Sequence, residues 1–484
     1  MRFRDFDPVH GKYSWFWLVI LGILLLAGNA RVGLWDQDEA AYAGFGRHMI
    51  ETGDWLVPEY TWSEVHRKPP FHFWGIAISQ YIFGENTWAT RLPGAIAIWL
   101  SCFLLWTQAS NIFGKAIGRW AALILGTSGL IQALGHISLT DSSLLLWQTL
   151  AALSLLHVVN AMKGHSWWFW LAIGLGALTK GPPIIIFSSL MLISLILLHP
   201  HRKFLFRFRF WLGLPLAVLP LFIWGYLAWQ RDDGVFVSWL IDWYILKRVS
   251  GSVFGQSGPP GYHLAFMLLM FLPWLAVLPF AIKKAWKGAK KHKAQTVEIL
   301  AWLAAGWLPY EIVSSKLPTY AFAAHPAFAL LLAYGLFHWK PASKLGVFFL
   351  EKKQSWLAVL CAFYLLIWGV FLPQFGHLKD SSLMVKASLE QHFDANAPML
   401  IGQSKAMPPS LPFYLEKHHP LSYNINPPKI TKWTQENPNG GLILNFEQAY
   451  KVTQLSSFVP IDTVSWRTSG KNTVIDYVIL KKGQ

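Results

Sequence analysis

Charged residues are scarce in this sequence of 484 residues, because Asp, Glu, Lys and Arg together make up only 14% of it. A typical soluble domain has roughly 25% charged residues. Hydrophobic residues reach 54%, and the chain contains 28 Trp. This composition excludes a disordered chain and argues against a soluble globular enzyme.

Cysteine is almost absent, with only Cys102 and Cys361 in the chain. Both lie in apolar runs, where a disulfide bridge would have no obvious structural use. The sequence therefore excludes a small secreted scaffold held together by disulfides.

Acidic residues are also few, with 25 Asp and Glu against 41 Lys and Arg, and the formal net charge is +16. In a soluble protein such an excess would suggest nucleic acid as a partner. Here the basic residues gather in short loops between apolar runs, which is the pattern that orients membrane proteins. We therefore expect membrane lipids, and no nucleic acid, among the partners.

Long apolar runs recur along the chain and determine the predicted fold class. A membrane-spanning helix needs roughly 20 mostly apolar residues. We predict spans at about 15–34, 91–108, 119–136, 141–159, 167–179, 183–198, 211–229, 262–282, 296–314, 319–338 and 355–374. The first run is longer than the apolar core of a signal peptide, so we predict a retained anchor. The expected fold is an all-α polytopic membrane protein with about 11 to 13 transmembrane helices, formed by residues 1–374.

The fifth and sixth runs are short and are separated only by residues 179–183. They form either a hairpin of two spans or one long broken helix. With the hairpin, the basic loops at 202–209, 283–293 and 340–353 all lie on the same inner side as the N-terminus. The charge pattern therefore favours the hairpin, in a multi-pass protein whose N-terminus lies on the inner side of the membrane.

Residues 375–484 differ in character, with Pro and Asn punctuating short alternating runs. Residues 441–446 and 472–480 have the pattern of strands. We predict a small α/β domain, and the odd number of spans places it on the outer side of the membrane. Among the Trp residues near span ends, Trp15, Trp35 and Trp274 are expected to form an interfacial belt.

Several polar clusters fall on this same outer side. They include the long outer loop at 35–90 and the segments at 138–141, 179–183, 247–263 and 314–320. Each cluster has an ordinary interpretation taken singly: Asp141 as a helix N-cap, Lys180 as a charge at a helix end, and Asp38 with Glu39 as a solvated loop start. Histidines such as His66, His72 and His263 are expected to be ordinary loop or interface residues.

Their convergence on one side of the membrane indicates a site. Acids and bases near helix ends are suited to hold an anionic headgroup beside a catalytic carboxylate. Lys68, Lys180, Arg248 and Lys316 are the candidates for countering the charge of a phosphate. A hydroxyl acceptor needs a base, for which we select Asp38, and Asp141 is assigned a supporting role.

The order of short motifs through the chain is specific. It runs from the segment 35–42, with Asp38, Glu39 and Tyr42, through 53–58, 68–74 and 91–93 to Asp141, 179–181, 272–274 and 315–320. Over about residues 34–335 this order resembles the bacterial lipid A aminoarabinose transferases, which are related to protein O-mannosyltransferases. The resemblance implies a GT-C glycosyltransferase that uses a polyprenyl-phosphate sugar donor and acts with inversion on the periplasmic side.

The same resemblance implies roles for individual residues. Asp38 matches the family's catalytic aspartate, with Glu39 beside it, and Asp141 matches a second acidic position. Lys68 matches a residue near the donor phosphate, and the last motif adds Lys316 and Tyr320 to the candidate phosphate-binding set, which is Lys68, Arg67, Lys180, Arg248, Lys316 and Tyr320.

Two positions depart from the family pattern. Ala41 stands where the family often has Arg, and Arg67 stands where it often has Glu before Lys-Pro. A guanidinium cannot ligate a cation, so we expect Arg67 and Lys68 to supply the positive charge and no metal or other cofactor to be required. If a divalent metal binds, His263 is the candidate ligand.

The predicted function is transfer of a sugar from a polyprenyl-phosphate donor to a lipid or glycan acceptor similar to lipid A. One alternative is a protein O-glycosyltransferase of the same superfamily, and nothing in the sequence separates the two acceptors. A second is a lipid-linked sugar transporter or flippase, which would place ionisable residues near the middle of the membrane rather than at span ends.

Overall fold

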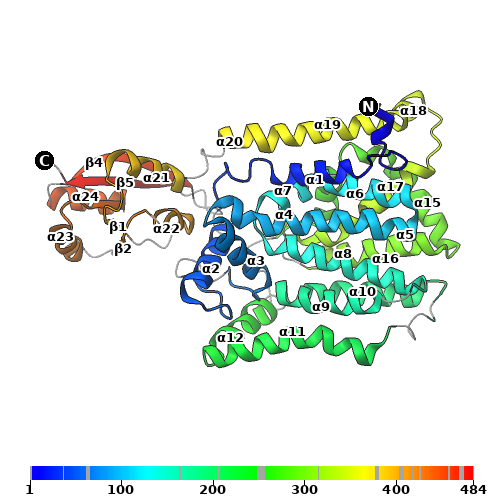
Figure 1. Ribbon diagram of the computed structural model, residues 1–484, viewed down its shortest axis with the longest axis horizontal. Coiled ribbons are helices and arrows are strands. Elements are labelled where there is room, and N and C mark those ends of the chain that lie inside the picture. Colours follow the sequence, from blue (N-terminus) through cyan, green and yellow to red (C-terminus); the bar gives the residue numbers. More distant parts are fainter. Residues whose placement is uncertain are drawn as a thin grey trace.

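The computed structural model describes residues 3–35, 38–60, 66–162, 165–201, 203, 208–247, 257–313, 316–375, 381–402, 408–416, 418–423, 427–455, 458–467 and 474–482. These residues form a bundle of helices and a smaller domain with a β-sheet at one end of it (Figure 1). The C-terminus lies in the smaller domain, and the N-terminus lies at the opposite end of the bundle.

The helices of the bundle follow the predicted spans closely. They are α1 (Phe16–Leu26), α4 (Thr87–Leu104) with η3 (Leu105–Ala109) and α5 (Ser110–Phe113), α6 (Lys115–Gly126), α7 (Gly129–His136), α8 (Thr140–Val159), α9 (His165–Lys180), α10 (Pro182–Leu198), α11 (Phe210–Arg231), α14 (Tyr262–Met270), η7 (Trp274–Val277), α15 (Leu278–Lys290), α16 (Ala294–Ile312), η8 (Tyr320–Ala324), α17 (His325–His338), α18 (Lys344–Glu351), α19 (Lys353–Leu366), η9 (Ile367–Phe371) and α20 (Leu372–Phe375). Among the described residues, five helices are long and apolar enough to cross a membrane, or up to seven if each of two bent pairs is one span. The chain is therefore a multi-pass membrane protein, as predicted.

Two predicted spans are broken rather than continuous. The run at 119–136 is the pair α6 and α7, bent by 60°, and the run at 262–282 is α14 followed by η7 and α15, bent by 110°. The second break contains Pro273, which has no amide hydrogen for a helix to use. Hydrophobicity alone identified these runs but not the bends inside them.

The α9–α10 hairpin is confirmed by contacts at both of its ends. At one end Lys180, the last residue of α9, forms an ion pair with Asp141 in the first turn of α8. At the other end His199, which follows α10, and Asn160, which follows α8, both contact the Glu298 carboxylate, at 3.2 and 2.6 Å. The chain therefore reverses at Gly181, where φ is +73° and a residue without a Cβ is favoured.

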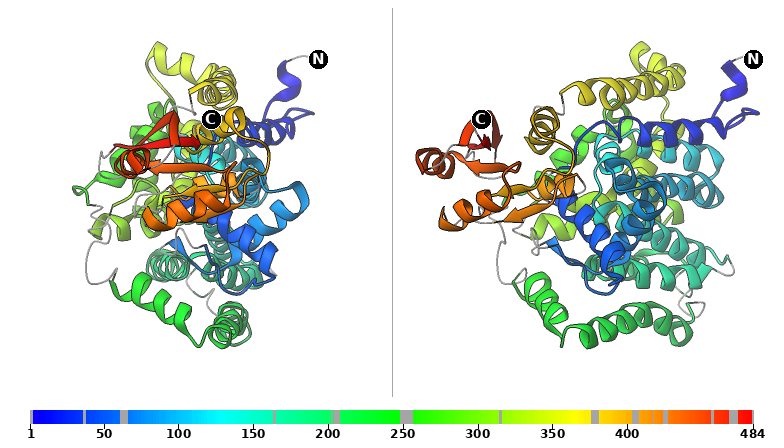
Figure 2. Two further views of the ribbon diagram at one scale, coloured as in Figure 1. Left: turned by 90° about the vertical axis from the view of Figure 1, so that its left-hand side faces the viewer. Right: turned by 60° about the vertical axis from the view of Figure 1, so that its left-hand side comes forward.

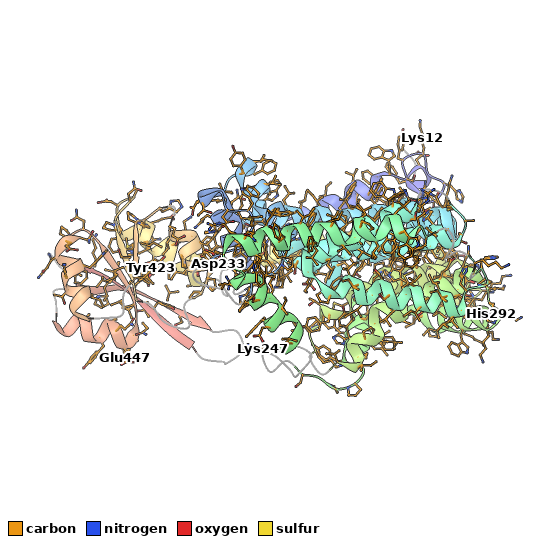
Figure 3. All side chains as sticks on the ribbon, turned by 90° about the horizontal axis from the view of Figure 1, so that it is seen from below. Lys12, Asp233, Lys247, His292, Tyr423 and Glu447 are labelled. Atoms are coloured by element: carbon orange, nitrogen blue, oxygen red, sulfur yellow. The ribbon has the colours of Figure 1, made fainter. Side chains whose placement is uncertain are left out.

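The outer loop folds into two helices at the end of the bundle that faces the C-terminal domain (Figure 1). These are α2 (Asp38–Thr52) and α3 (Phe71–Phe83), which pack together through Tyr42, Phe45 and Phe73. Beside them lies α12 (Val235–Ile241), followed by η5 (Asp242–Leu246). Figure 3 shows Lys12 and His292 at the far end of the bundle, so the predicted inner loops and the outer helices lie at opposite ends.

The C-terminal domain is a mixed five-stranded sheet with helices around it (Figure 2). Its elements are α21 (Ser381–His392), β1 (Met399–Ile401), α22 (Ser410–Leu415), β2 (Leu421–Tyr423), α23 (Pro427–Glu436), β3 (Gly441–Asn445), α24 (Phe446–Leu455), β4 (Phe458–Arg467) and β5 (Val474–Lys482). The strand order is β2-β1-β3-β5-β4, with β1 parallel to both of its neighbours and β5 antiparallel to both of its own. The small α/β domain is as predicted, and the two predicted strands are β3 and β5.

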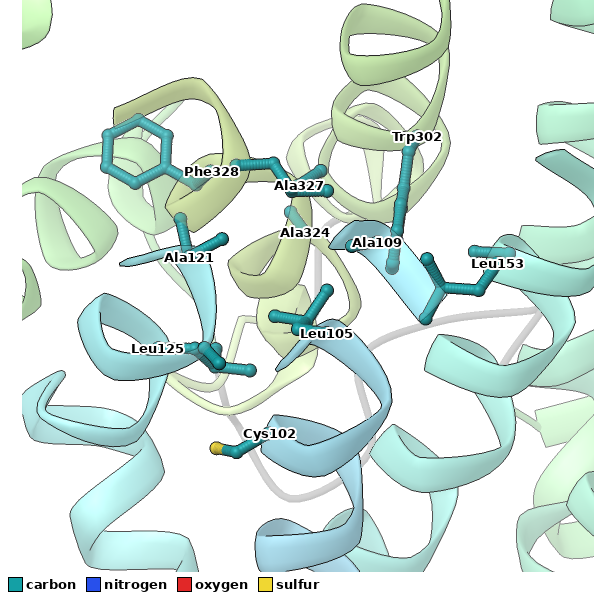
Figure 4. Close-up of a cluster of buried hydrophobic side chains, with 14 of the residues drawn as sticks. Cys102, Leu105, Ala109, Ala121, Leu125, Leu153, Trp302, Ala324, Ala327 and Phe328 are labelled. Atoms are coloured by element: carbon teal, nitrogen blue, oxygen red, sulfur yellow. The ribbon is translucent and has the colours of Figure 1, made fainter. Parts of the chain in front are cut away.

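The core of the bundle contains both cysteines as free, buried thiols. Figure 4 shows Cys102 close to Leu105 and Leu125 inside this core. Trp274 corrects the predicted aromatic belt, because it is fully buried against Trp120 rather than at the membrane surface. Trp274 lies in the middle of the predicted span 262–282, at the start of the segment that follows the 110° bend, and it packs into the core of the bundle.

Candidate active site

Asp38 is the first residue of α2, and its side chain is about half exposed, at 51%. Its carboxylate lies 3.6 Å from the imidazole Nε2 of His66. Burial lowers the pKa of His66, Asp38 raises it, and Lys68 lowers it. The net direction of the His66 pKa is downward, so the imidazole is mainly neutral near pH 7 and its contact with Asp38 is not a fixed ion pair.

Lys68 lies directly behind this pair and is nearly fully buried. Its ammonium group donates hydrogen bonds to the hydroxyl of Tyr42, one turn along α2 from Asp38, and to the backbone oxygen of His66. These two bonds, together with the packing of the ammonium over the Tyr42 ring, fix the position of Lys68. A fixed cation beside an exposed carboxylate is an arrangement suited to a substrate that carries a phosphate.

Arg67 points away from Lys68 although the two are adjacent in the sequence. Its guanidinium lies over the rings of Phe236 and Trp239 in α12, at 5.1 and 4.9 Å from their centroids. The two rings keep the guanidinium group of Arg67 in place, because an aromatic face attracts a cation. Arg67 and Lys68 therefore place two positive charges in different parts of the same loop.

Glu39 was predicted beside Asp38 as a catalytic residue, but its side chain makes structural contacts and is not accessible to a substrate. Its side chain is fully buried, and both carboxylate oxygens lie 2.8 Å from nitrogens of Arg91. The same oxygens accept the backbone N–H groups of Trp35 and Ser138. With four donors around it, Glu39 joins the start of α2 to α4 and to the segment before α8, and we do not carry it into the proposed catalytic set.

Asp141 and Lys180 form an ion pair, with both carboxylate oxygens within 2.9 Å of the ammonium nitrogen. The N-cap residue of α8 is Leu139, so Asp141 does not cap the helix with a hydrogen bond as the ordinary interpretation expected. Its carboxylate pairs with Lys180 instead. The pair is joined to the outer loop through His72, which lies between the hydroxyls of Ser138 and Ser143, 3.2 and 2.8 Å from its two ring nitrogens. The segment before α8 also contacts the start of α2, because the Ser138 N–H donates to the carboxylate of Glu39.

Lys316 is nearly buried and caps the end of α16. Its ammonium donates to the backbone oxygens of Tyr310 and Glu311 and lies 3.5 Å from the Glu311 carboxylate. This carboxylate also accepts the N–H groups of Gly261 and Leu264, at the start of α14. Lys316 is therefore held by helix ends and a carboxylate, which makes it a weaker candidate for a donor phosphate than Lys68.

His263 and Tyr320 lie beside Lys316. The Nε2 atom of His263 contacts the backbone oxygen of Leu317 at 2.9 Å, and its ring stacks with that of Tyr320. No group of three or more His, Cys, Asp or Glu side chains suited to a metal ion occurs within the described part of the chain. The remaining candidate, Arg248, lies outside the described residues.

Two site residues were missed in the sequence argument. Glu311 organises the junction of α14 and α16, and the signal for it was an acid near the end of a mostly apolar run that also contains Glu298. Arg47 is the other, as its guanidinium contacts Glu85 at 2.7 Å, Glu416 at 2.9 Å and the backbone oxygen of Phe413. Arg47 therefore ties α2, which carries Asp38, to the C-terminal domain.

Comparison with known proteins agrees with this picture. The family described as dolichyl-phosphate-mannose-protein mannosyltransferase matches residues 67–227. An undecaprenyl phosphate-alpha-4-amino-4-deoxy-L-arabinose arabinosyl transferase from Edwardsiella ictaluri is 28% identical over 66% of this chain and 59% of its own length. The corresponding protein from Pseudomonas aeruginosa is 28% identical over 66% of this chain and 58% of its own length. The matched segment thus covers about three fifths of the length of these relatives.

Solved structures show the same architecture along nearly the whole chain. ArnT from Cupriavidus metallidurans, in the apo state, superposes with a TM-score of 0.76 at 18% identity, covering 97% of both chains. The same protein bound to undecaprenyl phosphate gives 0.74 at 19% identity, covering 96% of this chain and 98% of that one. The fold is therefore the GT-C fold of membrane-embedded glycosyltransferases. Within that class, the resemblance to the aminoarabinose transferases and the mannosyltransferase family is confirmed.

Proposed function

We propose that this chain is an inverting glycosyltransferase that moves a sugar from a polyprenyl-phosphate donor to a lipid acceptor similar to lipid A. The observation that carries the proposal is the position of Asp38. Its exposed carboxylate lies at the start of α2, beside His66 and in front of the cation Lys68. The relatives named above support the same chemistry, because their names describe an undecaprenyl-phosphate-linked sugar and its transfer.

In the proposed reaction the bond between the anomeric carbon and the phosphate oxygen breaks, and the oxygen of the acceptor bonds to the opposite face of that carbon. A hydroxyl acceptor gives its proton to Asp38, while a phosphate acceptor is already ionised and needs only to be oriented. The polyprenyl phosphate departs with the electron pair. Lys68 and Arg67 stabilise the charge that develops on it.

Lys180 and Lys316 have different parts in this proposal. Each is paired with a carboxylate of its own, Asp141 or Glu311, so each adds little net charge to the site. Asp141 and Lys180 instead hold the start of α8 and the end of α9 together. Tyr320 and His263 line the region next to Lys316.

The test is transfer by the purified full-length chain from a synthetic undecaprenyl-phosphate sugar to lipid A, with mass spectrometry of the product. A mass increase equal to one sugar residue supports the proposal. If the protein instead moves the donor across a vesicle membrane and transfers no sugar, the proposal is wrong and the transporter alternative holds.

A protein acceptor is a second candidate, and the match to the protein mannosyltransferase family favours it. Glycolipids and periplasmic glycoproteins from a deletion strain separate the two acceptors. Loss of a modified lipid supports the first candidate, and loss of a glycoprotein supports the second.

The proposed orientation places the Asp38 end and the C-terminal domain in the periplasm of a bacterial inner membrane. Cysteines at Lys287 and Lys432 test it, because both side chains are exposed and the native Cys102 and Cys361 are buried. An impermeant maleimide added to spheroplasts, which lack the outer membrane barrier, is expected to label position 432 and not position 287. The reverse pattern would contradict the orientation.

A further inference from the structure

One segment of the C-terminal domain, residues 408–416, reaches the outer helices of the bundle. It contains α22, which lies on the side of the domain that faces α2 (Figure 1), and we call it the α22 segment. The hydroxyl of Tyr60, in the loop after α2, donates to the Pro409 backbone oxygen of this segment at 2.7 Å. The N–H of Leu34, just before α2, donates to the hydroxyl of its Tyr414 at 2.7 Å. The α22 segment is therefore bound to the chain both before and after α2.

The same segment covers one face of α2. Ala40, Ala43 and Arg47 follow one another at helical spacing, so they lie along one side of α2. The two alanines form a small buried cluster with Leu34 and Phe413. The guanidinium carbon of Arg47 lies 4.1 Å from the centroid of the Phe413 ring, and a guanidinium nitrogen donates to the Phe413 backbone oxygen at 2.6 Å. The small side chains at positions 40 and 43 allow the α22 segment to approach α2 closely.

The opposite face of α2 packs on the bundle. Tyr42, Phe45 and Met49 belong to a buried cluster that includes Phe73 of α3. As a result every residue of α2 from 39 to 47 is buried. A helix at the surface of a protein usually exposes one polar face, and α2 exposes none along this stretch. Its position is therefore determined from two sides, by α3 and by the α22 segment.

Tyr60 extends this contact to the loop that leads to Lys68. Its ring lies directly against Gly44 of α2, where a Cβ would come within 2.5 Å of ring carbons. Its side chain is almost fully buried, and its hydroxyl reaches the α22 segment. Tyr60 therefore contacts α2 with its ring and the C-terminal domain with its oxygen, eight residues before Lys68.

From these contacts we propose that the α22 segment holds α2 in the position that transfer requires, and that Tyr414 and Tyr60 are positioning residues for the reaction. The inference rests on the proposed function. Asp38 is the first residue of α2, so a small shift of this helix moves its carboxylate. A displacement of about 1 Å at a reacting group can lower a rate on the order of 100-fold. The C-terminal domain is then part of the catalytic machinery and not a separate binding module.

The effect is expected in kcat and not in the KM for the donor. In the proposed reaction Asp38 accepts a proton in the transition state, whereas the donor phosphate meets Lys68. Lys68 is held by Tyr42, on the face of α2 that packs on α3. Loss of a contact on the other face of α2 leaves this arrangement in place.

The experiment measures initial rates of the purified full-length protein over a range of concentrations of a synthetic undecaprenyl-phosphate sugar. Tyr414→Phe and Tyr60→Phe each remove one hydroxyl and keep the ring, so the risk to folding is small. Each is expected to lower kcat about tenfold, with the KM for the donor within about twofold of wild type. Tyr450→Phe is the matched control, because this exposed tyrosine lies on α24 of the same domain, and it is expected to keep the wild-type kcat.

A second measurement separates positioning from a contact that only stabilises the fold. Hydrogen exchange and thermal unfolding are recorded on the same samples. Positioning predicts faster exchange in residues 38–47 of both variants at a nearly unchanged unfolding temperature. A merely stabilising contact would lower the unfolding temperature, and the folded protein would keep the wild-type kcat.

The outcomes distinguish this proposal from the proposed function. Wild-type kcat in both Tyr414→Phe and Tyr60→Phe, while wild type transfers sugar, would overturn the positioning role and leave the proposed function intact. A higher KM for the donor at unchanged kcat would also overturn it, in favour of a role in donor binding. Equal loss of kcat in Tyr450→Phe would overturn it as well, because the loss would not depend on the contact with α2. A wild-type protein that transfers no sugar would refute the proposed function, and the positioning role with it.

Discussion

The carboxylate of Asp141 and the ammonium of Lys180 lie 2.8 Å apart, at the start of α8 and the end of α9. Both side chains are largely buried, at 8% and 18% exposed. Two buried charges that neutralise one another fix the relative position of two helices beside Asp38. Removing one partner leaves the other as an uncompensated charge.

Lys180→Met is therefore expected to destabilise the protein by about 3 kcal/mol. The double variant Asp141→Asn/Lys180→Met is expected to recover most of this loss, because no charge is then left alone. Thermal unfolding in detergent measures both. A single variant as stable as wild type would show that the pair does not hold α8 and α9 together.

The contact of Arg47 with Glu416 couples the C-terminal domain to α2. Arg47→Met leaves Glu85 and Glu416 without their cation and is expected to cost on the order of 2 kcal/mol. Hydrogen exchange is expected to become faster in α22, which contacts Arg47 through Phe413, and to stay the same in α24. Lys432→Met is the control, and equal exchange in α22 of both variants would contradict the coupling.

His72 makes stability depend on pH. It is fully buried in the outer loop, outside the membrane spans, and burial, assisted by the charge of Lys68, lowers its pKa to about 3. Above about pH 6.5, His72 is neutral in both the folded and the unfolded state, so it does not make the free energy of unfolding depend on pH. Below it only the unfolded state binds a proton, so stability falls by up to about 1.4 kcal/mol per pH unit until the pH approaches 3.

The check compares unfolding temperatures at pH 7 and pH 5 for wild type, His72→Gln and the exposed His10→Gln. His72→Gln is expected to lose less stability between the two pH values than wild type, by about 2 kcal/mol. His10→Gln is expected to match wild type. An equal loss in all three proteins would rule out His72 as a source of the pH dependence.

Metal removal is expected to leave sugar transfer intact. The guanidinium of Arg67 is held over Phe236 and Trp239 of α12, and His263 is engaged with the Leu317 backbone oxygen. Activity after exhaustive chelation, with metal content measured on the same sample, tests this. Activity that is lost and then restored by zinc, magnesium or manganese would contradict it and make His263 the first ligand to mutate.

Hydrophobic run length and charge bias were sufficient to predict the helices of the bundle and the reversal at Gly181. Both signals are local, and the membrane imposes them on each segment separately. The bend after Gly126 has no such signal, whereas the break after Met270 contains Pro273, a local signal that run length and charge bias do not use.

The contacts between the candidate site residues could not be predicted from the sequence. Asp141, Lys180 and Lys316 were all candidates, but the pairing of Lys180 with Asp141 and of Lys316 with Glu311 became visible only in three dimensions. Glu39 shows the same limit: its partner Arg91 is 52 residues away, and only the fold reveals that its carboxylate is saturated with donors. Sequence indicates which groups share one face of the membrane, and packing decides which charges remain for a substrate.

The central claim is that Asp38 carries the transfer reaction, and the direct measurement is turnover of Asp38→Asn with a purified undecaprenyl-phosphate sugar donor. The account predicts a loss of at least about 100-fold with an unchanged unfolding temperature, because the side chain is half exposed and its replacement is nearly isosteric. Glu59→Gln, an exposed carboxylate in the same loop, is expected to keep wild-type turnover. Turnover of Asp38→Asn within a few-fold of wild type would contradict the account.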